Sequence, residues 1–391
     1  MRLGILTHKL IKGDGQGRVN YEIARAALDR GHQAVLLASE VAPELAAHPA
    51  VTWVHLPVSR WPTELVRNQI FAWRSSGWLR AHHVKLDLIL ANGCITWYPA
   101  DVNAVHFVHS AWMRSPVHTA RLHRGPYGWY QWVYTTVNAA WERHAFKQAG
   151  LIVAVSDQVR DDLVRMGVAP DQIQVIPNGV DHDEFSPGGT DRTSLGLPGG
   201  VVLGVFIGDI RTPRKNLDSV LKALQFVPAL HLAVVGEVEG SPYPQMARRL
   251  NVHDRVHFLG YRLDVADIMR ACDVCICPSR HEPFSLVLLE ALATGLPVVT
   301  ARAVGAAQLV DSDCGIILDD PEDDAAMAAA LGRLVVSRTL RSEMGRAARA
   351  KAECHSWGEM AGQYLCLFEQ LSEGVSGGGT IRGGVSARRE L

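Results

Sequence analysis

Segments typical of β-strands and α-helices alternate along most of this 391-residue sequence. The apolar run Arg2–Thr7 is followed by a glycine-containing loop, an amphipathic stretch from about Arg18 to Arg30, and a second apolar run, His32–Ser39. Two strands that are connected through a helix lie parallel in a sheet. Because this order recurs to about residue 319, the sequence predicts a doubly wound α/β architecture that occurs twice.

The length predicts two domains, because a single core rarely extends over a chain of this size. The predicted boundary lies in a segment rich in glycine, proline and aspartate, Ile176–Gly200. We expect residues 1–178 to form an N-terminal domain and residues 179–356 to form a C-terminal domain. Residues 357–372 are predicted to be a helix that packs back on the N-terminal domain, and the Gly/Ser-rich, basic residues 373–391 to be a disordered tail.

The composition is that of an ordinary soluble protein. The formal net charge is −1, which argues against a general affinity for nucleic acid. No apolar run reaches the length that crosses a bilayer, and the N-terminus enters a strand without a signal-peptide pattern. Seven cysteines are scattered along the chain, and this odd number favours a reducing compartment. We therefore expect a cytoplasmic protein.

The stretch Ser279–Thr300 carries two carboxylates that flank a predicted helix start. Pro283 fits the first turn of a helix, and the apolar residues from Phe284 to Thr294 continue it. A helix N-terminus presents free N–H groups and binds phosphate readily. With Glu282 before this end and Glu290 about two turns into the helix, the stretch suits a ligand that has hydroxyl groups on both sides of a diphosphate, as a nucleotide sugar has.

Three cations follow the strand-like residues 201–208: Arg211, Arg214 and Lys215. A loop at the carboxyl end of a parallel strand is where open α/β sheets bind ligands, and such cations can clamp a diphosphate. The alternative is an ordinary solvated loop.

Glycines also follow the first strand, at Gly13, Gly15 and Gly17. They indicate a loop that lets the backbone approach a phosphate, or simply a structural turn. They do not form the dinucleotide fingerprint, because Arg18 stands where its third glycine belongs.

Histidine and cysteine pairs do not form a predicted metal site. His106 and His109 lie at the end of a predicted strand, where residues three apart cannot share a face. One of them, preferably His109, points toward a ligand, or both are core residues. Cys272, Cys275 and Cys277 are predicted to be buried core residues. Two acidic triplets, residues 181–183 and 311–313, are interpreted as turns.

Nine of the ten tryptophans fall between Trp53 and Trp141, where aromatic and basic residues interleave. Glu142 is the single acidic residue from Val102 to Ser156, whereas the same stretch contains the bases Arg114, Arg121, Arg124, Arg143 and Lys147. One interpretation is a buried aromatic helix with a solvated basic face. The other is a patch that contacts an anionic membrane or a charged glycan.

The stretch Ser279–Val299 resembles the signature of the retaining family 4 glycosyltransferases, which have the GT-B fold. The matching parts are two glutamates, a short aromatic-containing turn and a G-x-P-V-V sequence: Glu282, Pro283-Phe284-Ser285, Glu290 and Gly295-Leu296-Pro297-Val298-Val299. Further landmarks occur in the family's order, including GDGQG, VIPNGVDHDEF, GDIRTPRKNL and RVHFLGY. The resemblance implies two Rossmann-like domains that face each other across a cleft.

The resemblance also implies roles for individual residues. Glu290 would bind the ribose hydroxyls of the nucleotide, and Glu282 would contact the donor sugar near the reacting carbon. Arg214 and Lys215 would neutralise the leaving diphosphate, and His109 would lie near the sugar and the acceptor. The remaining donor-binding positions are the cation Arg211, the glycines Gly15 and Gly17, the helix-start residues Pro283, Phe284, Ser285 and Leu286, and Tyr261, which with Gly260 would line the base pocket.

The implied function is transfer of a hexose-type sugar from a UDP- or GDP-sugar to a glycan or lipid-linked acceptor, with retention and without a metal or other cofactor. The acceptor would belong to lipopolysaccharide or another cell-surface polysaccharide, and the protein would contact the cytoplasmic face of the membrane. Two alternatives remain: a nucleotide-sugar epimerase or hydrolase of the same fold, and a non-catalytic glycan- or membrane-associated binding protein. The sequence departs from the family pattern at Ser285, Ala306 and Gln308, which puts local sugar or phosphate contacts in question.

Overall fold

The computed structural model of the protein describes residues 1–376, which form two compact units. The first unit contains Met1–Asn178 together with the helix that starts at Trp357, and the second unit is Gly179–Ser356. Within the described residues, no helix is both long enough and apolar enough to cross a membrane.

A parallel sheet of seven strands is the centre of the first unit as far as the structure describes it. Its strand order is β5-β3-β1-β6-β7-β8-β9. The strands are β1 (Arg2–Leu6), β3 (Gln33–Ala38), β5 (Val51–His55), β6 (Leu88–Asn92), β7 (Val102–Val105), β8 (Leu151–Ala154) and β9 (Ile173–Val175). The short strands β2 (Lys9–Leu10) and β4 (Glu40–Val41) pair with each other beside it.

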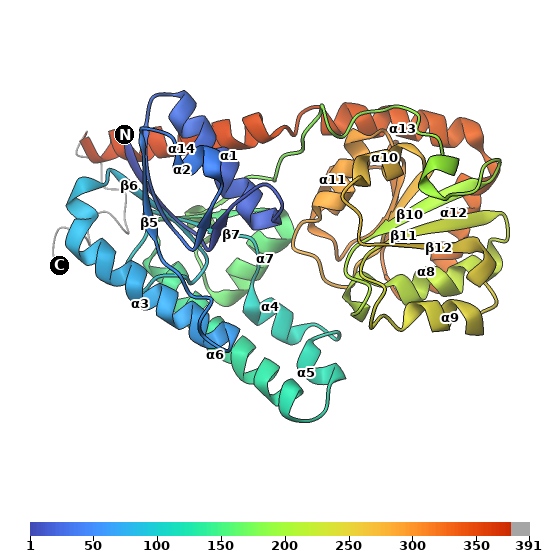
Figure 1. Cartoon of the computed structure of the whole chain (residues 1–391), viewed down its shortest axis with the longest axis horizontal. Helices are drawn as coiled ribbons and strands as arrows, with labels where there is room; N and C mark the ends of the chain where they lie inside the picture. The colour runs from blue at the N-terminus through green and yellow to red at the C-terminus, as the bar shows by residue number, and fades with distance from the viewer. Residues whose placement is uncertain (377–391) are drawn as a thin grey trace. The chain divides into compact units, whose positions relative to one another are not determined.

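Helices cover both faces of this sheet, with α1 and α14 on one side and α3 and α6 on the other (Figure 1). The helices are α1 (Gly15–Asp29), α2 (Pro43–Ala46), α3 (Glu64–His82), α4 (His109–Arg114), α5 (Thr119–Leu122), α6 (Pro126–Gln148), α7 (Asp157–Met166) and α14 (Trp357–Ser376). The central strands are buried on both faces, which explains their continuous apolar runs.

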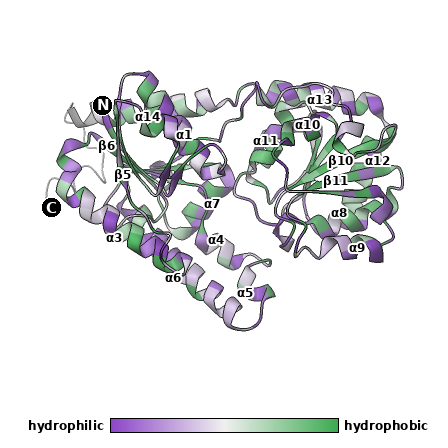
Figure 2. Ribbon diagram, viewed as in Figure 1, coloured by the Kyte–Doolittle hydropathy of each residue, from purple (hydrophilic) through white to green (hydrophobic). Residues whose placement is uncertain are grey.

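The second unit is built on a parallel sheet of six described strands, in the order β12-β11-β10-β13-β14-β15. The strands are β10 (Val202–Ile207), β11 (Leu230–Val235), β12 (Val256–Gly260), β13 (Val274–Cys277), β14 (Val298–Ala301) and β15 (Gly315–Leu318). The helices are α8 (Leu217–Ala223), α9 (Tyr243–Arg249), α10 (Val265–Arg270), α11 (Leu286–Ala293), α12 (Asp324–Val336) and α13 (Arg338–Ala352). Figure 2 shows the hydrophobic strands enclosed by helices with hydrophilic outer faces.

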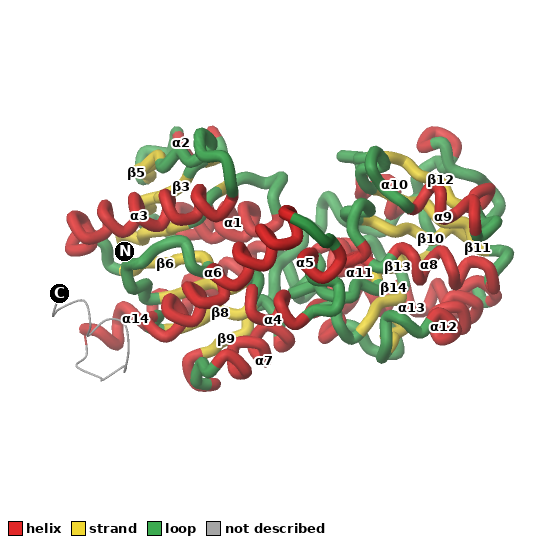
Figure 3. The backbone as a smooth tube through the Cα atoms, turned by 90° about the horizontal axis from the view of Figure 1, so that it is seen from below, coloured by secondary structure: helices red, strands yellow, loops and turns green. Residues whose placement is uncertain are grey.

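Both sheets confirm the predicted doubly wound α/β fold. In each, the strand order reverses beside the first strand, between β1 and β6 and between β10 and β13. At such a switch point the following loops diverge to opposite faces of the sheet and leave a crevice beyond the carboxyl ends of the strands. In Figure 3 the strands of each sheet run side by side across the view, with helices in front of them. The fold therefore directs attention to the residues that follow β1, β6, β10 and β13.

Several predicted element boundaries were wrong. The helix predicted from about Arg18 begins three residues earlier, at Gly15, because Asp14 is its N-cap. The helix predicted from Pro283 and Phe284 begins at Leu286, with Ser285 as its cap. Ser337 separates α12 from α13 and caps α13.

At the C-terminus, α14 continues past Ser372 to Ser376, so the first residues of the predicted tail are helical. The rest of that predicted disordered tail, residues 377–391, lies outside the described residues.

Candidate functional site

At the switch point of the second unit, the loops after β10 and β13 bring two cations to one carboxylate. Lys215 Nζ donates to Glu282 Oε2 at 2.5 Å, and Arg214 Nη1 donates to the same oxygen at 3.2 Å. The Glu282 side chain is only 13% exposed. Burial by itself raises the pKa of this carboxyl, but Lys215 and Arg214 offset that effect and hold the pKa below its usual value. Glu282 is therefore ionised at neutral pH.

The Lys215 side chain passes close to the backbone of a glycine on its way to Glu282. Gly208 directly follows β10 and has a φ of +155°. A Cβ atom there would lie 3.1 Å from Cε of Lys215, so any side chain would displace the lysine stem. Asn216, the residue after Lys215, takes φ +67°. Its Nδ2 donates to the carbonyl oxygens of Pro278 and Pro321, at 3.1 and 2.7 Å, and these bonds fix the end of the turn that carries Lys215.

Arg280 binds the backbone of the turn that carries Arg214 and Lys215. Its N–H donates to the Arg214 carbonyl at 2.9 Å, and its Nη1 donates to the Pro213 carbonyl at 2.7 Å. The guanidinium also donates to both carboxylate oxygens of Asp218, each at 2.7 Å, and to Glu322. With a side chain only 7% exposed, Arg280 is a rigid, bidentate brace.

The segment that contains Glu282 is held by the loop after β14. Gly305 N–H donates to the Glu282 carbonyl at 2.8 Å, and Ala306 N–H donates to the Phe284 carbonyl at 2.7 Å. Ala306, where the sequence departs from the family pattern, thus supplies a backbone contact that does not depend on its side chain.

Helix α11 begins directly after this segment, at Leu286. Ser285 takes φ +95° and ψ +94°, an uncommon conformation for a residue other than glycine, and its Oγ accepts from Leu288 N–H at 3.3 Å. The first N–H groups of any helix lack intrahelical acceptors, so the amides of Leu286 and Val287 are suited to an anion. Glu290 lies in the second turn of the helix.

Arg211 and Tyr261 are two further predicted residues. Arg211 is exposed and binds Asp209 Oδ1 through both its backbone N–H and Nε, at 3.0 and 3.2 Å. Tyr261 follows β12 and exposes most of its surface. Lys215 and Arg214 thus contact Glu282 while Arg211 contacts Asp209, and a role of Arg211 in binding a diphosphate stays a prediction.

In the first unit, His109 is the first residue of α4, not the end of a strand as predicted. Strand β7 ends at Val105, and the imidazole is held by Glu142 of α6, with Nδ1 and Oε1 2.5 Å apart. Burial lowers the pKa of the nearby His106 to about 4, so His106 is neutral at physiological pH.

Of the glycines after β1, Gly15 and Gly17 lie in the first turn of α1, whereas Gly13 precedes its Asp14 cap. Gly17 N–H donates to Asp14 Oδ1 at 2.6 Å, and a Cβ atom on Gly17 would crowd Asp14 and the Ile11 carbonyl. Gly17 is thus engaged by the helix cap, whereas Gly15 is exposed. Of the two predicted phosphate-approach glycines, Gly15 has the more accessible backbone.

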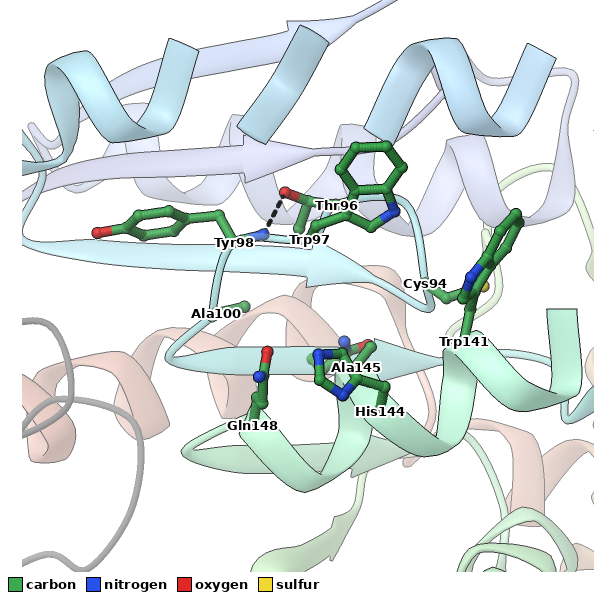
Figure 4. A pocket seen from close by; sticks show the side chains of 10 residues that line it. Cys94, Thr96, Trp97, Tyr98, Ala100, Trp141, His144, Ala145 and Gln148 are labelled. Atoms are coloured by element: carbon green, nitrogen blue, oxygen red, sulfur yellow. Dashed lines mark hydrogen bonds between the residues drawn. The ribbon is translucent and has the colours of Figure 1, made fainter. Parts of the chain in front are cut away.

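Aromatic side chains at the start of α6 are exposed, which overturns the interpretation as a buried aromatic helix. Trp129 is 69% and Trp132 is 51% exposed. Residues 121–127, which include Arg121 and Arg124, are exposed as well. The small cavity farther along α6 has a volume of about 20 Å³, room for about one water, and is lined by Trp97 and Trp141 among others (Figure 4).

Metal-binding side chains are not clustered in the described part of the chain, where no group of three or more His, Cys, Asp or Glu could hold an ion. The acidic triplets form turns in which Asp181 and Asp311 accept from backbone N–H groups two residues on. Cys272, Cys275 and Cys277 are buried, as predicted.

Two Rossmann-like units, one of which carries a carboxylate and two cations at its switch point, define a glycosyltransferase of the GT-B type. A family model described as Glycosyltransferase Family 4 matches residues 13–184, and one described as Glycosyl transferases group 1 matches residues 202–337. The chain is 30% identical to a D-inositol 3-phosphate glycosyltransferase from Xylanimonas cellulosilytica, over 92% of this chain and 93% of that protein. The chain therefore belongs to the family 4 glycosyltransferases of group 1, as the sequence signature predicted.

Solved structures show the same fold. The crystal structure of WaaG, a glycosyltransferase involved in lipopolysaccharide biosynthesis, aligns with a TM-score of 0.75 and 22% identity, over 94% of this chain and 99% of that one. Anabaena HepE in complex with UDP and glucose aligns with a TM-score of 0.70 and 22% identity, over 95% of this chain and all of that one.

Proposed function

We propose that this glycosyltransferase moves a hexose from a nucleotide-diphosphate sugar to a glycan or lipid-linked acceptor, with retention of anomeric configuration. The observation that carries the proposal is the meeting of Lys215, Arg214 and Glu282 at the switch point of the second sheet. The two cations suit a diphosphate, and the carboxylate suits sugar hydroxyls. UDP or GDP is the proposed nucleotide, and the HepE complex with UDP and glucose supports UDP first.

In the proposed donor site, Lys215 and Arg214 contact the diphosphate, together with the first N–H groups of α11. Glu282 accepts hydrogen bonds from the sugar, and Glu290 from the ribose. Arg211 and Tyr261, on the loops after β10 and β12, are further proposed donor contacts, and the backbone of Gly15 in the first unit is proposed to contact phosphate. His109 binds a hydroxyl of the sugar or the acceptor.

The proposed reaction breaks the bond between the anomeric carbon and the diphosphate oxygen. The acceptor oxygen bonds to the same carbon on the same face, and its proton passes to the departing diphosphate. Cations that are fixed before the reaction stabilise the charge that develops on the leaving group. In this scheme the protein's own cations take the place of a metal ion.

The exposed start of α6 supports a lipid-linked acceptor. The exposed Trp129 and Trp132 follow Arg121 and Arg124 closely in the sequence, in a stretch whose single acid is the buried Glu142. Exposed tryptophans with basic neighbours suit the interface of an anionic membrane. We propose that the protein is cytoplasmic and approaches the membrane through this surface.

A second candidate acceptor is a phosphorylated inositol. The relative from Xylanimonas cellulosilytica carries that activity in its name, and its similarity extends over nearly the whole chain. A small soluble acceptor of this kind would not require contact with a membrane.

Product mass separates these possibilities. The purified protein is incubated with a panel of UDP- and GDP-sugars and with either inositol phosphate or a lipid-linked glycan fraction, and the products are weighed. One hexose added to the lipid-linked fraction supports the main proposal, and one added to inositol phosphate supports the second candidate. Donor consumption without any acceptor would favour the hydrolase or epimerase alternative.

Liposome co-sedimentation tests the membrane surface. Wild-type protein is expected to favour anionic over neutral vesicles, and a Trp129→Ser, Trp132→Ser variant to lose that preference. Phe226→Ser is the control, because Phe226 is an exposed aromatic residue of the other unit. Equal binding to both kinds of vesicle by the wild type would contradict the membrane proposal.

A further inference from the structure

Glu142 is a buried carboxylate with an unusual setting. It is the single acid from Val102 to Ser156, and only 2% of its surface is exposed. A carboxylate in this position costs free energy unless strong donors satisfy it. Both of its oxygens are used by one residue, His109.

The contacts between these residues fix the imidazole in place. His109 backbone N–H donates to Glu142 Oε2 at 2.8 Å, while Nδ1 lies 2.5 Å from Oε1. Two contacts from one carboxylate, one to the backbone and one to the ring, set the side-chain rotamer. The Phe107 and Tyr134 rings stand edge-on to the imidazole, with centroids 5.1 and 5.8 Å away, and limit its rotation.

The same contacts fix the tautomer. An ionised carboxylate only accepts hydrogen bonds, so Nδ1 must carry the proton that points at Glu142. In the neutral imidazole, Nε2 is then an acceptor. The His109 side chain is 18% exposed against 2% for Glu142, so the histidine is the more accessible member of the pair.

We infer that Glu142 is a positioning residue, which holds His109 in the Nδ1–H tautomer so that Nε2 accepts a hydrogen bond from a hydroxyl group of the sugar or acceptor. This inference rests on the proposed role of His109 in the transfer reaction. The arrangement follows the general logic by which a carboxylate orients a working imidazole through its other nitrogen.

A purely structural role makes a different prediction. His109 is the first residue of α4, and a carboxylate that accepts its N–H also caps that helix. Loss of a cap would lower stability without setting the tautomer, so the test must read the tautomer directly.

The test uses Glu142→Gln. The glutamine oxygen can still accept the His109 N–H, but its amide nitrogen only donates, and this forces the Nδ1 of His109 to accept and the proton to move to Nε2. Long-range ¹H–¹⁵N spectra of the histidine rings, with the His109 signals assigned from a His109→Asn variant, should show Nδ1–H in the wild type and Nε2–H in Glu142→Gln. Turnover should fall roughly 10- to 100-fold, as is common when an orienting partner is lost.

Double substitution tests whether Glu142 acts through His109. On a His109→Ala background, Glu142→Gln should have little further effect on turnover. Full turnover of Glu142→Gln with a switched tautomer, or an Nε2–H tautomer in the wild type, would overturn the inference. Full turnover of His109→Ala would instead refute the proposed role of His109, so the two failures are distinguishable.

Discussion

The two units share a strand order but use their switch points differently. In the second unit, the loop after β10 carries Arg214 and Lys215, and both meet Glu282 from the loop after β13. In the first unit, the loop after β1 ends in the Asp14 cap of α1, and a hydrogen bond joins His109, which follows β7, to Glu142. The comparison shows that the same topology can carry different side chains: two cations around a carboxylate in the second unit, and a histidine held by a carboxylate in the first.

The two units also differ in backbone strain. Among the described residues, the non-glycine residues with positive φ are Asn216, Asn251 and Ser285, all in the second unit. Asn216 follows Lys215, and Ser285 caps the helix that starts beside Glu282. Strain of this kind persists where surrounding contacts over-determine the backbone, often at functional sites. The second unit thus holds its cluster in a preset geometry.

The largest expected effect is that of Lys215→Ala, which would break the charge cluster of the second unit. Loss of a charge-assisted contact to the diphosphate should cost about 1.5–3 kcal/mol, or roughly 10- to 100-fold in kcat/KM for the donor. Lys222→Ala, which removes a more exposed lysine paired with Asp324, is the control and should leave kcat/KM unchanged. Unchanged donor kinetics in Lys215→Ala would remove the basis for assigning the diphosphate to this unit.

Arg280→Ala tests whether the brace, and not charge alone, distinguishes the second unit. The cationic turn would lose its bonds to the Arg280 guanidinium, so we expect kcat/KM for the donor to fall by roughly 10-fold and the melting temperature to drop. The control is Arg302→Ala, because the Arg302 side chain is exposed and pairs with the exposed Asp319. A lower melting temperature with an unchanged kcat/KM of the folded protein would show that Arg280 has no part in positioning the turn.

The pH dependence of stability follows from Glu282. Its folded pKa lies below its ordinary value, so the unfolded state binds the proton more readily, and the stabilisation is present above that ordinary value. As pH falls through the folded pKa, this contribution is lost. The free energy of unfolding of the wild type should therefore exceed that of Glu282→Gln at pH 7, and the difference should shrink under acidic conditions. A difference that stays constant from pH 7 to about pH 3 would contradict the charge pairing.

Ser285→Gly should have the smallest effect, and a stabilising one. Glycine should relieve the positive-φ strain at this position, which is worth about 1–3 kcal/mol. Two smaller costs oppose this gain: the greater flexibility of glycine, about 0.5–1 kcal/mol, and the replacement of a serine cap by glycine, about a few tenths of a kcal/mol. The net gain should be about 1 kcal/mol, measured by urea unfolding. Ser337→Gly is the matched control, because Ser337 caps α13 at φ −111° without such strain, and it should be destabilising. Equal effects at both positions would show that Ser285 is unstrained.

Much of this comparison was accessible from the sequence. The strands were predictable because buried parallel strands are continuous apolar runs. A motif and a loop at a strand end singled out Glu282, Arg214 and Lys215, but the direct contact between them was not predicted. Helix starts were missed where a cap decided them: Asp14 begins α1 early, and strained Ser285 begins α11 late.

The positioning residues were missed for a different reason. Arg280 braces Asp218, 62 residues away, and Glu142 holds His109, 33 residues away, so local patterns do not reveal either pair. One signal was available for Glu142: a lone acid in a long basic and aromatic stretch requires a partner. For Arg280 the signal was its place two residues before Glu282.

Calorimetric titration of nucleotides tests the central claim, that the second unit holds the donor diphosphate through its cation cluster. Wild-type protein should bind UDP or GDP at least 10-fold more tightly than the corresponding monophosphate, since the distal phosphate adds charge-assisted contacts. In Lys215→Ala, the diphosphate should lose most of that advantage while the affinity for the monophosphate changes little. Equal affinity for diphosphate and monophosphate in the wild type, or an undiminished preference in Lys215→Ala, would contradict the assignment.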